Sequence, residues 1–282
     1  MSFTMPEYLS VPGERLGEGT PVKVHGAGDM EDVARRMARD ILALVAAVRR
    51  EGRAATLIVP VGPVDQFPLL ADAINRQHDD WRDVMLVNMD EYLTDDDHWV
   101  DIDHPLGFRG YMQRAFYDRI DPALAPRPEN RVFPDPADCG AIARQIEARG
   151  GVDGCFGGIG INGHVAFNEP PEPGQTMSVA QFADLPTRVL DLSRETRTIN
   201  SVTVGGEIAV IPRRAVTVGM REILASRRLR FYCNRPWQRA VVRRVLHGPI
   251  TPACPASLLR THPDVELTVA DYVAELPDIR LR

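Results

Sequence analysis

Hydrophobic residues follow two spacings along the chain, and each spacing predicts a different kind of element. Apolar side chains three or four residues apart mark an amphipathic helix from about Asp29 to Arg50. Asp29 suits the start of this helix, Arg49 and Arg50 suit its last turn, and Gly52 suits its end. We therefore expect a long helix whose apolar stripe packs against a core.

Short, uninterrupted apolar runs lie between the helical segments. The first run is Ala54–Pro60, and it ends in the turn signal Val61–Gly62–Pro63. Such runs are typical of strands that are buried on both faces, as in parallel sheets. The two patterns predict further elements, namely strands at Val84–Asn88, Cys155–Ile159, Val189–Leu192, Ala215–Val218, Leu229–Cys233 and Val265–Val269, and helices at Asp65–Gln77, Phe108–Tyr117, Ala141–Arg149 and Trp237–Leu246.

Strands that alternate with helices predict an α/β fold with a doubly wound, Rossmann-like and mostly parallel sheet flanked by helices. No linker rich in proline, glycine or serine divides the sequence. We therefore expect a single domain over residues 1–282, with a short N-terminal extension over 1–21. Ligands of such sheets bind beyond the carboxyl ends of the strands, so functional residues are expected at that edge.

Composition narrows the list of partners. The 282 residues include 33 Lys and Arg against 39 Asp and Glu, which gives a net charge of −6. A mildly acidic protein lacks the broad positive field that would attract a nucleic acid or an anionic membrane, so we expect neither partner. The four cysteines form no C-x-x-C pair, and neither a signal peptide nor an apolar run of about 20 residues is present, so we expect a cytoplasmic protein with reduced thiols. A homo-oligomer is left open.

Two carboxylates follow the predicted strand Val84–Asn88. Asp90 and Glu91 come directly after its end, at the ligand-binding edge of the sheet. A carboxylate partly screened from water there has a raised pKa and can serve as a general base. The alternative, in which Asp90 caps a turn and Glu91 is solvated, stays open on this segment alone.

A glycine-rich segment follows the predicted strand Cys155–Ile159. Gly158, Gly160 and Gly163 match the G-x-G-x-x-G spacing of dinucleotide-binding loops, but that motif must open a helix. Prolines at 170, 171 and 173 leave no room for one, which excludes the dinucleotide interpretation. The glycines still indicate that the backbone approaches another group closely.

His164 lies within the same segment. Histidine titrates near neutral pH and can both donate and accept a proton. Glu169 could hold its ring in one tautomer, and Asn162 could add a hydrogen bond from the same turn. This setting favours a functional histidine over a structural one.

Two arginines and one acidic run are weaker candidates. Arg239 lies in the first turn of the helix expected after Pro236, where an anion is stabilised, and Arg197 lies in the polar segment 195–201. Solvated surface arginines would have the same pattern. The run Asp95–His104 contains ligand types for zinc or magnesium, but its spacing fixes no geometry. We expect a solvated acidic loop there and no metal site.

Several motifs resemble the glucosamine-6-phosphate deaminase/isomerase family. The two most specific are N-M-D-E-Y at 88–92 and G-I-G-x-N-G-H-x-A-F-N-E-P at 158–170. Further matches are T-R-x-x-N-S at 196–201, I-P-x-x-A-V-T-V-G-M at 211–220, Q-R-A at 238–240 and S-L-L-R-T-H-P at 257–263. Their order and approximate spacing extend the resemblance from about Val22 to the last residues.

The resemblance implies an aldose–ketose isomerisation coupled to loss of ammonia, in amino-sugar metabolism. Asp90 would move a proton between C2 and C1 of the open-chain sugar. His164 would open the sugar ring, oriented by Glu169 and Asn162. Proton transfer of this kind requires neither a redox cofactor nor a metal. On this basis we expect a hydrolase, deaminase and isomerase.

The resemblance also assigns the substrate contacts. Arg197 would bind the substrate phosphate, and Arg239 stands where the family commonly has a phosphate-binding lysine. The backbone at Gly62, Gly160 and Gly163 would contact the substrate, and a lid would cover it from about 170–195.

The sequence departs from the family pattern at two places. The family's phosphate loop is Gly-Gly-Thr/Ser, but Pro60–Gln66 here has no hydroxyl, Pro63 removes an N–H donor, and Asp65 would repel an anion if it faced inward. Asn162 stands where many members have aspartate and contributes no charge. The reaction is therefore better defined than the sugar. A non-phosphorylated sugar, a 6-phosphogluconolactonase-like lactonase and a non-catalytic sugar-phosphate sensor are the alternatives.

Overall fold

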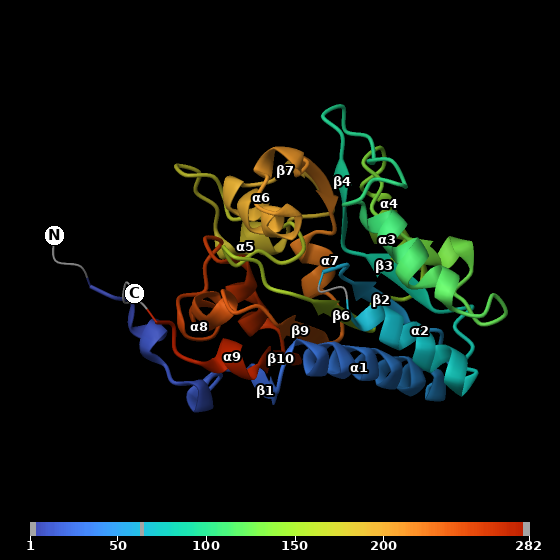
Figure 1. Ribbon diagram of the computed structural model, residues 1–282, viewed down its shortest axis with the longest axis horizontal. Helices are drawn as coiled ribbons and strands as arrows, with labels where there is room; N and C mark the ends of the chain where they lie inside the picture. The colour runs from blue at the N-terminus through green and yellow to red at the C-terminus, as the bar shows by residue number, and fades with distance from the viewer. Residues whose placement is uncertain (1–3, 63–64, 279–282) are drawn as a thin grey trace.

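A seven-stranded sheet forms the centre of the computed structural model, which describes residues 4–62 and 65–278 (Figure 1). The strand order is β1-β10-β9-β6-β2-β3-β5, and every neighbouring pair is parallel. The strands are β1 (Lys23–Ala27), β2 (Thr56–Val59), β3 (Met85–Asn88), β5 (Arg131–Val132), β6 (Gly154–Gly157), β9 (Leu229–Cys233) and β10 (Val265–Ala270). The predicted doubly wound α/β fold is confirmed.

Helices flank this sheet and complete its core. They are α1 (Met30–Arg50), α2 (Gln66–Gln77), α3 (Phe108–Ala115), α4 (Ala141–Ala148), α5 (Val179–Ala183), α6 (Arg194–Ser201), α7 (Met220–Leu224), α8 (Gln238–His247) and α9 (Asp271–Ala274). α1 and α2 lie side by side in Figure 1. Met37 and Ile41 of α1 belong to the same fully buried hydrophobic core as Leu57 and Ile58 of β2, and each such side chain contributes roughly 1.5–3 kcal/mol.

The start of α1 follows from its sequence. The side chain of Asp29 caps the helix by accepting a hydrogen bond of 2.9 Å from the backbone N–H of Asp32. Two arginines occupy the last turn, where the helix dipole favours positive charge. The predicted helix is confirmed with its bounds nearly unchanged.

A second, smaller sheet was not predicted. It consists of β4 (Asp90–Leu93), β8 (Arg214–Thr217) and β7 (Arg188–Asp191), paired antiparallel in the order β4-β8-β7. The strands expected at Val189–Leu192 and Ala215–Val218 exist, but their assignment to the doubly wound sheet was wrong. A short apolar run indicates a buried strand without indicating which strand it pairs with.

Met89 joins the two sheets. Its backbone N–H donates to the carbonyl oxygen of Val59 in β2 at 2.9 Å, and its own carbonyl accepts from the N–H of Val218 at 2.7 Å. The chain therefore leaves β3 of the parallel sheet and enters β4 of the antiparallel sheet within one residue. This junction places Asp90 where the two sheets meet.

The N-terminal residues pack against the C-terminal part of the chain. The buried Arg243 of α8 donates to the carbonyl oxygens of Val11 at 2.8 Å and Ala274 at 2.6 Å. Its guanidinium therefore connects the N-terminal segment, α8 and α9. Within residues 4–62 and 65–278, no helix combines the length and apolar character that crossing a membrane would require.

Candidate active site

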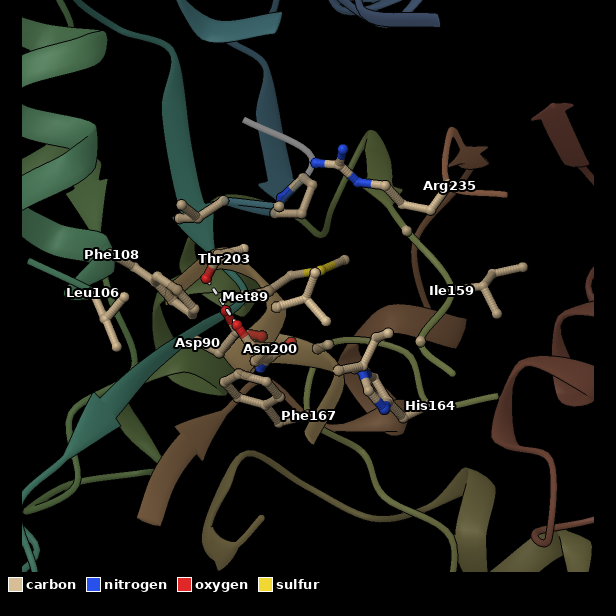
Figure 2. A pocket seen from close by; sticks show the side chains of 18 of the residues that line it. Met89, Asp90, Leu106, Phe108, Ile159, His164, Phe167, Asn200, Thr203 and Arg235 are labelled. Atoms are coloured by element: carbon tan, nitrogen blue, oxygen red, sulfur yellow. Dashed lines mark hydrogen bonds between the residues drawn. The ribbon is translucent and has the colours of Figure 1, made fainter. Parts of the chain in front are cut away.

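A cavity of about 780 Å³ lies beyond the carboxyl ends of the central parallel strands (Figure 2). Segments that follow β2, β3, β6 and β9 contribute to its wall, among them Gly62, Asp90, Gly160 and Arg235. The rule for doubly wound sheets predicts a ligand at this edge. Asp90 and His164, which lie 74 positions apart in the sequence, both line this one cavity.

The Asp90 carboxyl has no hydrogen-bond partner in the described part of the chain. Its residue is only 7% exposed, at the first position of β4. Burial raises the pKa of Asp90 well above its ordinary value, and the neighbouring carboxylate of Glu91 raises it further. When it is ionised, this carboxylate is therefore a stronger base than a solvated aspartate.

Glu91 has a different environment from its neighbour. Its carboxylate is buried and accepts hydrogen bonds from the backbone N–H groups of Tyr92, Phe108 and Arg109 at 2.7–2.9 Å. Burial raises the pKa of Glu91, and these three donors partly offset the effect. The alternative in which Glu91 is solvated was wrong, because this buried carboxylate holds the first turn of α3 beside the cavity.

Gly160 makes room for the His164 ring. A Cβ atom at position 160 would lie 2.1 Å from Nε2 and Cε1 of His164, so no other residue fits without moving the imidazole. Gly163 has a φ of +91°, which favours glycine, and a Cβ atom there would lie 2.6 Å from Sγ of Cys254. Gly160 lines the cavity, whereas Gly163 shapes the turn that presents His164.

Three side chains surround Nδ1 of His164. The Oδ1 atom of Asn162 lies 2.9 Å away, Oγ1 of Thr196 3.1 Å away and Oε2 of Glu169 3.7 Å away. Asn162 donates through Nδ2 to Glu169 at 2.7 Å, so its Oδ1 is the acceptor toward the ring. Nδ1 therefore carries the proton, and Nε2 is left as the free base.

Burial also determines the charge of this histidine. It lowers the pKa of His164 below the ordinary value of 6.5, and the carboxylate of Glu169 partly offsets that effect. The imidazole is therefore neutral near pH 7. A neutral ring can accept a proton at Nε2 while Nδ1 keeps its hydrogen bond to Asn162.

Sequence reasoning missed the contribution of α6. Ser193 caps this helix, and its backbone N–H donates to Glu169 at 3.2 Å. Thr196, one turn on, contacts His164, and Asn200 lines the cavity and donates to the hydroxyl of Tyr92 at 2.9 Å. The helix has no apolar stripe to reveal it, but the Ser193 cap and the polar T-R-x-x-N-S motif are signals that were available.

The two predicted phosphate-binding arginines point elsewhere in this structure. Arg197 donates to the backbone carbonyls of Ile208 and Ile211 at 3.1 and 3.3 Å. Arg239 donates to the carbonyl of Tyr272 at 2.6 Å and forms an ion pair with Glu275. Neither arginine lines the cavity, because these acceptors hold both guanidinium groups away from it.

The altered loop after β2 is described only in part. Gly62 lines the cavity, as expected of a backbone contact, whereas Asp65 does not line it. Pro63, whose missing N–H was expected to weaken anion binding, lies outside the described residues. In the acidic run, Asp97 pairs with Arg214, and no group of three or more potential metal ligands is found among the described residues.

Fold and site together define an α/β enzyme in which one cavity holds a neutral histidine and a buried carboxylate that has no hydrogen-bond partner among residues 4–62 and 65–278. No protein-family model matches the chain. The glucosamine-6-phosphate deaminase of Halothermothrix orenii is 30% identical over 216 residues, which is 76% of this chain and 83% of that protein. A solved monomeric glucosamine-6-phosphate deaminase superimposes with a TM-score of 0.77 at 26% identity, over 91% of this chain and all of that one. The chain belongs to the glucosamine-6-phosphate deaminase family.

The comparisons correct one expectation. Description of the chain as a hydrolase was wrong, because the relatives that establish the family are deaminases. The 6-phosphogluconolactonase of Thermotoga maritima superimposes with a TM-score of 0.65 but is only 16% identical, over 89% of this chain and all of that one. Such a likeness shows a shared fold alone.

Proposed function

We propose that this enzyme converts an amino-sugar phosphate, glucosamine 6-phosphate or a close analogue, into a ketose phosphate and ammonia. The observation that carries the proposal is that Asp90 and His164 line the same cavity from two different strand ends. One group of each kind is needed, because the ring must be opened before a carbon-bound proton can be moved.

His164 opens the ring in this mechanism. Nε2 takes the proton from the anomeric hydroxyl and returns it to the ring oxygen, which leaves an aldehyde at C1. The ring is fixed for this step because Asn162 and Thr196 hold Nδ1, and Asn162 is itself held by Glu169. Orientation by such partners keeps the imidazole in one tautomer.

Asp90 then moves the carbon-bound proton. The ammonium group on C2 would be the missing partner of its buried carboxylate, and a cation there lowers the pKa of Asp90 so that it ionises. The carboxylate takes the proton from C2 and delivers it to C1, while the C1 oxygen gains the proton that the ammonium group loses. The resulting imine at C2 reacts with water, releases ammonia and leaves the ketose.

Further proposals concern the surroundings of the site. We propose a single domain whose segment 170–195 serves as a lid, supported by the bond from Ser193 to Glu169, which connects β7 and α6 to the histidine. The cysteines at 139, 155, 233 and 254 are free, which supports a reducing compartment such as the cytoplasm. Assembly into a homo-oligomer stays a prediction, and the solved relative is monomeric.

An assay of both products tests the proposal. The purified protein is incubated with glucosamine 6-phosphate and, separately, with glucosamine, and ammonia and ketose are measured. We expect the two products in equal amounts, and uptake of deuterium from heavy water at C1 of the ketose. Binding of the sugar phosphate without ammonia release would contradict the proposal and favour a sensor.

A further inference from the structure

The cavity has one cationic side chain in the described part of the chain. Of the lysines and arginines there, only Arg235 lines it. Arg235 lies two residues after the end of β9 and approaches the cavity from a different side than Asp90 and His164 (Figure 2). The end of the cavity near Arg235 therefore differs in charge from the end that carries the proposed base.

The guanidinium of Arg235 has no carboxylate partner among the residues the structure describes. Its side chain is exposed, and its one hydrogen bond there is to the sulfur of Met30 at 3.2 Å. Arg239 of the same segment is instead paired with Glu275. An arginine that no anion of its own chain neutralises is available to an anionic ligand.

Asn234 supplies a second, independent observation. It lines the cavity and is only 4% exposed, yet its Nδ2 group has no hydrogen-bond partner among the residues that the structure describes. A buried N–H donor without an acceptor is costly, and such groups commonly await a ligand or a water. The missing partner must be a hydrogen-bond acceptor.

Gln238 fixes the backbone between these residues and α8. Its Oε1 accepts from the N–H of Arg235 at 2.7 Å, and its Nε2 donates to the carbonyl of Ile159 at 2.8 Å. The donors of Asn234 and Arg235 are thus held just before the N-terminus of α8, whose partial positive charge adds to theirs. A cation, an unpaired donor and a helix start together fit an anion with several acceptor oxygens.

We propose that Arg235 and Asn234 bind the phosphate group of the substrate and so determine specificity for phosphorylated amino sugars. This inference rests on the proposed function. It assigns the cationic contact to Arg235 instead of Arg239, and it explains how the chain can hold a phosphate although its loop after β2 has no hydroxyl.

Steady-state kinetics of Arg235→Ala test the assignment. Ammonia release is measured against the concentration of glucosamine 6-phosphate and of glucosamine. We expect KM for the phosphorylated sugar to rise about 10–100-fold with kcat nearly unchanged, because a charge-assisted contact remote from the reacting carbons is lost. KM for glucosamine should not change. Arg235→Lys, which keeps the charge, should restore part of the difference, and Asn234→Ala should raise KM in the same selective way.

Arg244→Ala is the matched control, since Arg244 lies on α8 and donates to the carbonyl of Ala253. Unchanged KM for glucosamine 6-phosphate in Arg235→Ala, or a larger rise in Arg239→Ala, would overturn the assignment while leaving the proposed function intact. If the wild type releases no ammonia, the proposed function fails. Calorimetric titration of the wild type and of Arg235→Ala with inorganic phosphate then tests whether Arg235 binds an anion. Loss of phosphate binding in the variant supports the assignment, and equal binding by the two proteins refutes it.

Discussion

The loop that carries His164 and the sheet junction that carries Asp90 face one cavity but are built differently. Nδ1 of His164 has three polar side chains around it, and these are connected in turn through Glu169 and Ser193. The carboxyl of Asp90 has no hydrogen-bond partner in the described chain. The histidine is thus positioned before any ligand binds, whereas the aspartate would gain its first hydrogen-bond partner from a bound ligand.

The difference has an energetic consequence. A satisfied network holds its geometry at little cost, whereas a buried carboxyl without partners destabilises the folded chain. A cationic substrate recovers that cost on binding. The following changes test whether the two regions do have these separate roles.

Replacement of Asp90 by Asn should have the largest effect. The amide keeps the shape but cannot accept a proton, so we expect the rate of ammonia release to fall about 10²–10⁴-fold. Exchange of the C2 proton with deuterium, followed by NMR, should fall by the same factor. Ring opening by His164 should continue, which anomerisation of the bound sugar can show. Ammonia release at the wild-type rate would remove Asp90 as the base.

A methyl group at Gly160 should have the next largest effect. In Gly160→Ala the new Cβ would lie 2.1 Å from Nε2 of His164, so the imidazole must move. A displacement of about 1 Å can cost on the order of 10²-fold in rate. Gly26→Ala is the matched control, because its Cβ would meet only Oδ1 of Asp271 at 3.8 Å. Equal kcat/KM values for the two variants would contradict a rigidly preset histidine.

The fold could be predicted largely because the central strands are buried on both faces. The apolar run Ala54–Pro60 marks β2 for that reason, and the apolar stripe marks α1. In contrast, β1 lies at an edge and contains His25 and Gly26, so no apolar run reveals it. β4 begins with Asp90 and Glu91, and its partner β8 is far away in sequence, which no local pattern can indicate.

The site was partly predictable for the same reason. Asp90 and His164 each follow a buried strand, and the ends of parallel strands share an edge. The direction of a long arginine depends on acceptors that only the tertiary structure supplies, such as Glu275 for Arg239. Thr196 was missed because α6 is short and has no stripe of apolar residues that would predict a helix packed on a core.

Asp90→Asn should also raise the free energy of unfolding, an effect that we expect to be smaller than the losses in rate described above. The pKa of Asp90 is raised on folding, so between about pH 4 and the folded pKa the native state holds a proton that the unfolded state has lost. The free energy of unfolding therefore falls as pH rises through this window, by roughly 1.4 kcal/mol for each pH unit. The variant should lose that dependence. Urea unfolding of both proteins at pH 4, 6 and 8 measures it, and parallel curves would contradict an unpaired, buried carboxyl.

The smallest expected change is in the titration of His164. Glu169 lies 3.7 Å from Nδ1 and raises the pKa of His164 against the opposing effect of burial. Glu169→Gln removes this charge but keeps an acceptor, so the imidazolium is less favoured and the pKa of His164 should fall further. NMR titration of histidine-labelled protein, with the His164 signal assigned through His164→Gln, gives the value without relying on turnover. Glu172→Gln changes an exposed carboxylate nearby and should leave the pKa as it is. A pKa of His164 that rises in Glu169→Gln would mean that Glu169 acts on the histidine mainly by excluding water. The side chains around Nδ1 would then hold the imidazole through packing and not through the charge of Glu169.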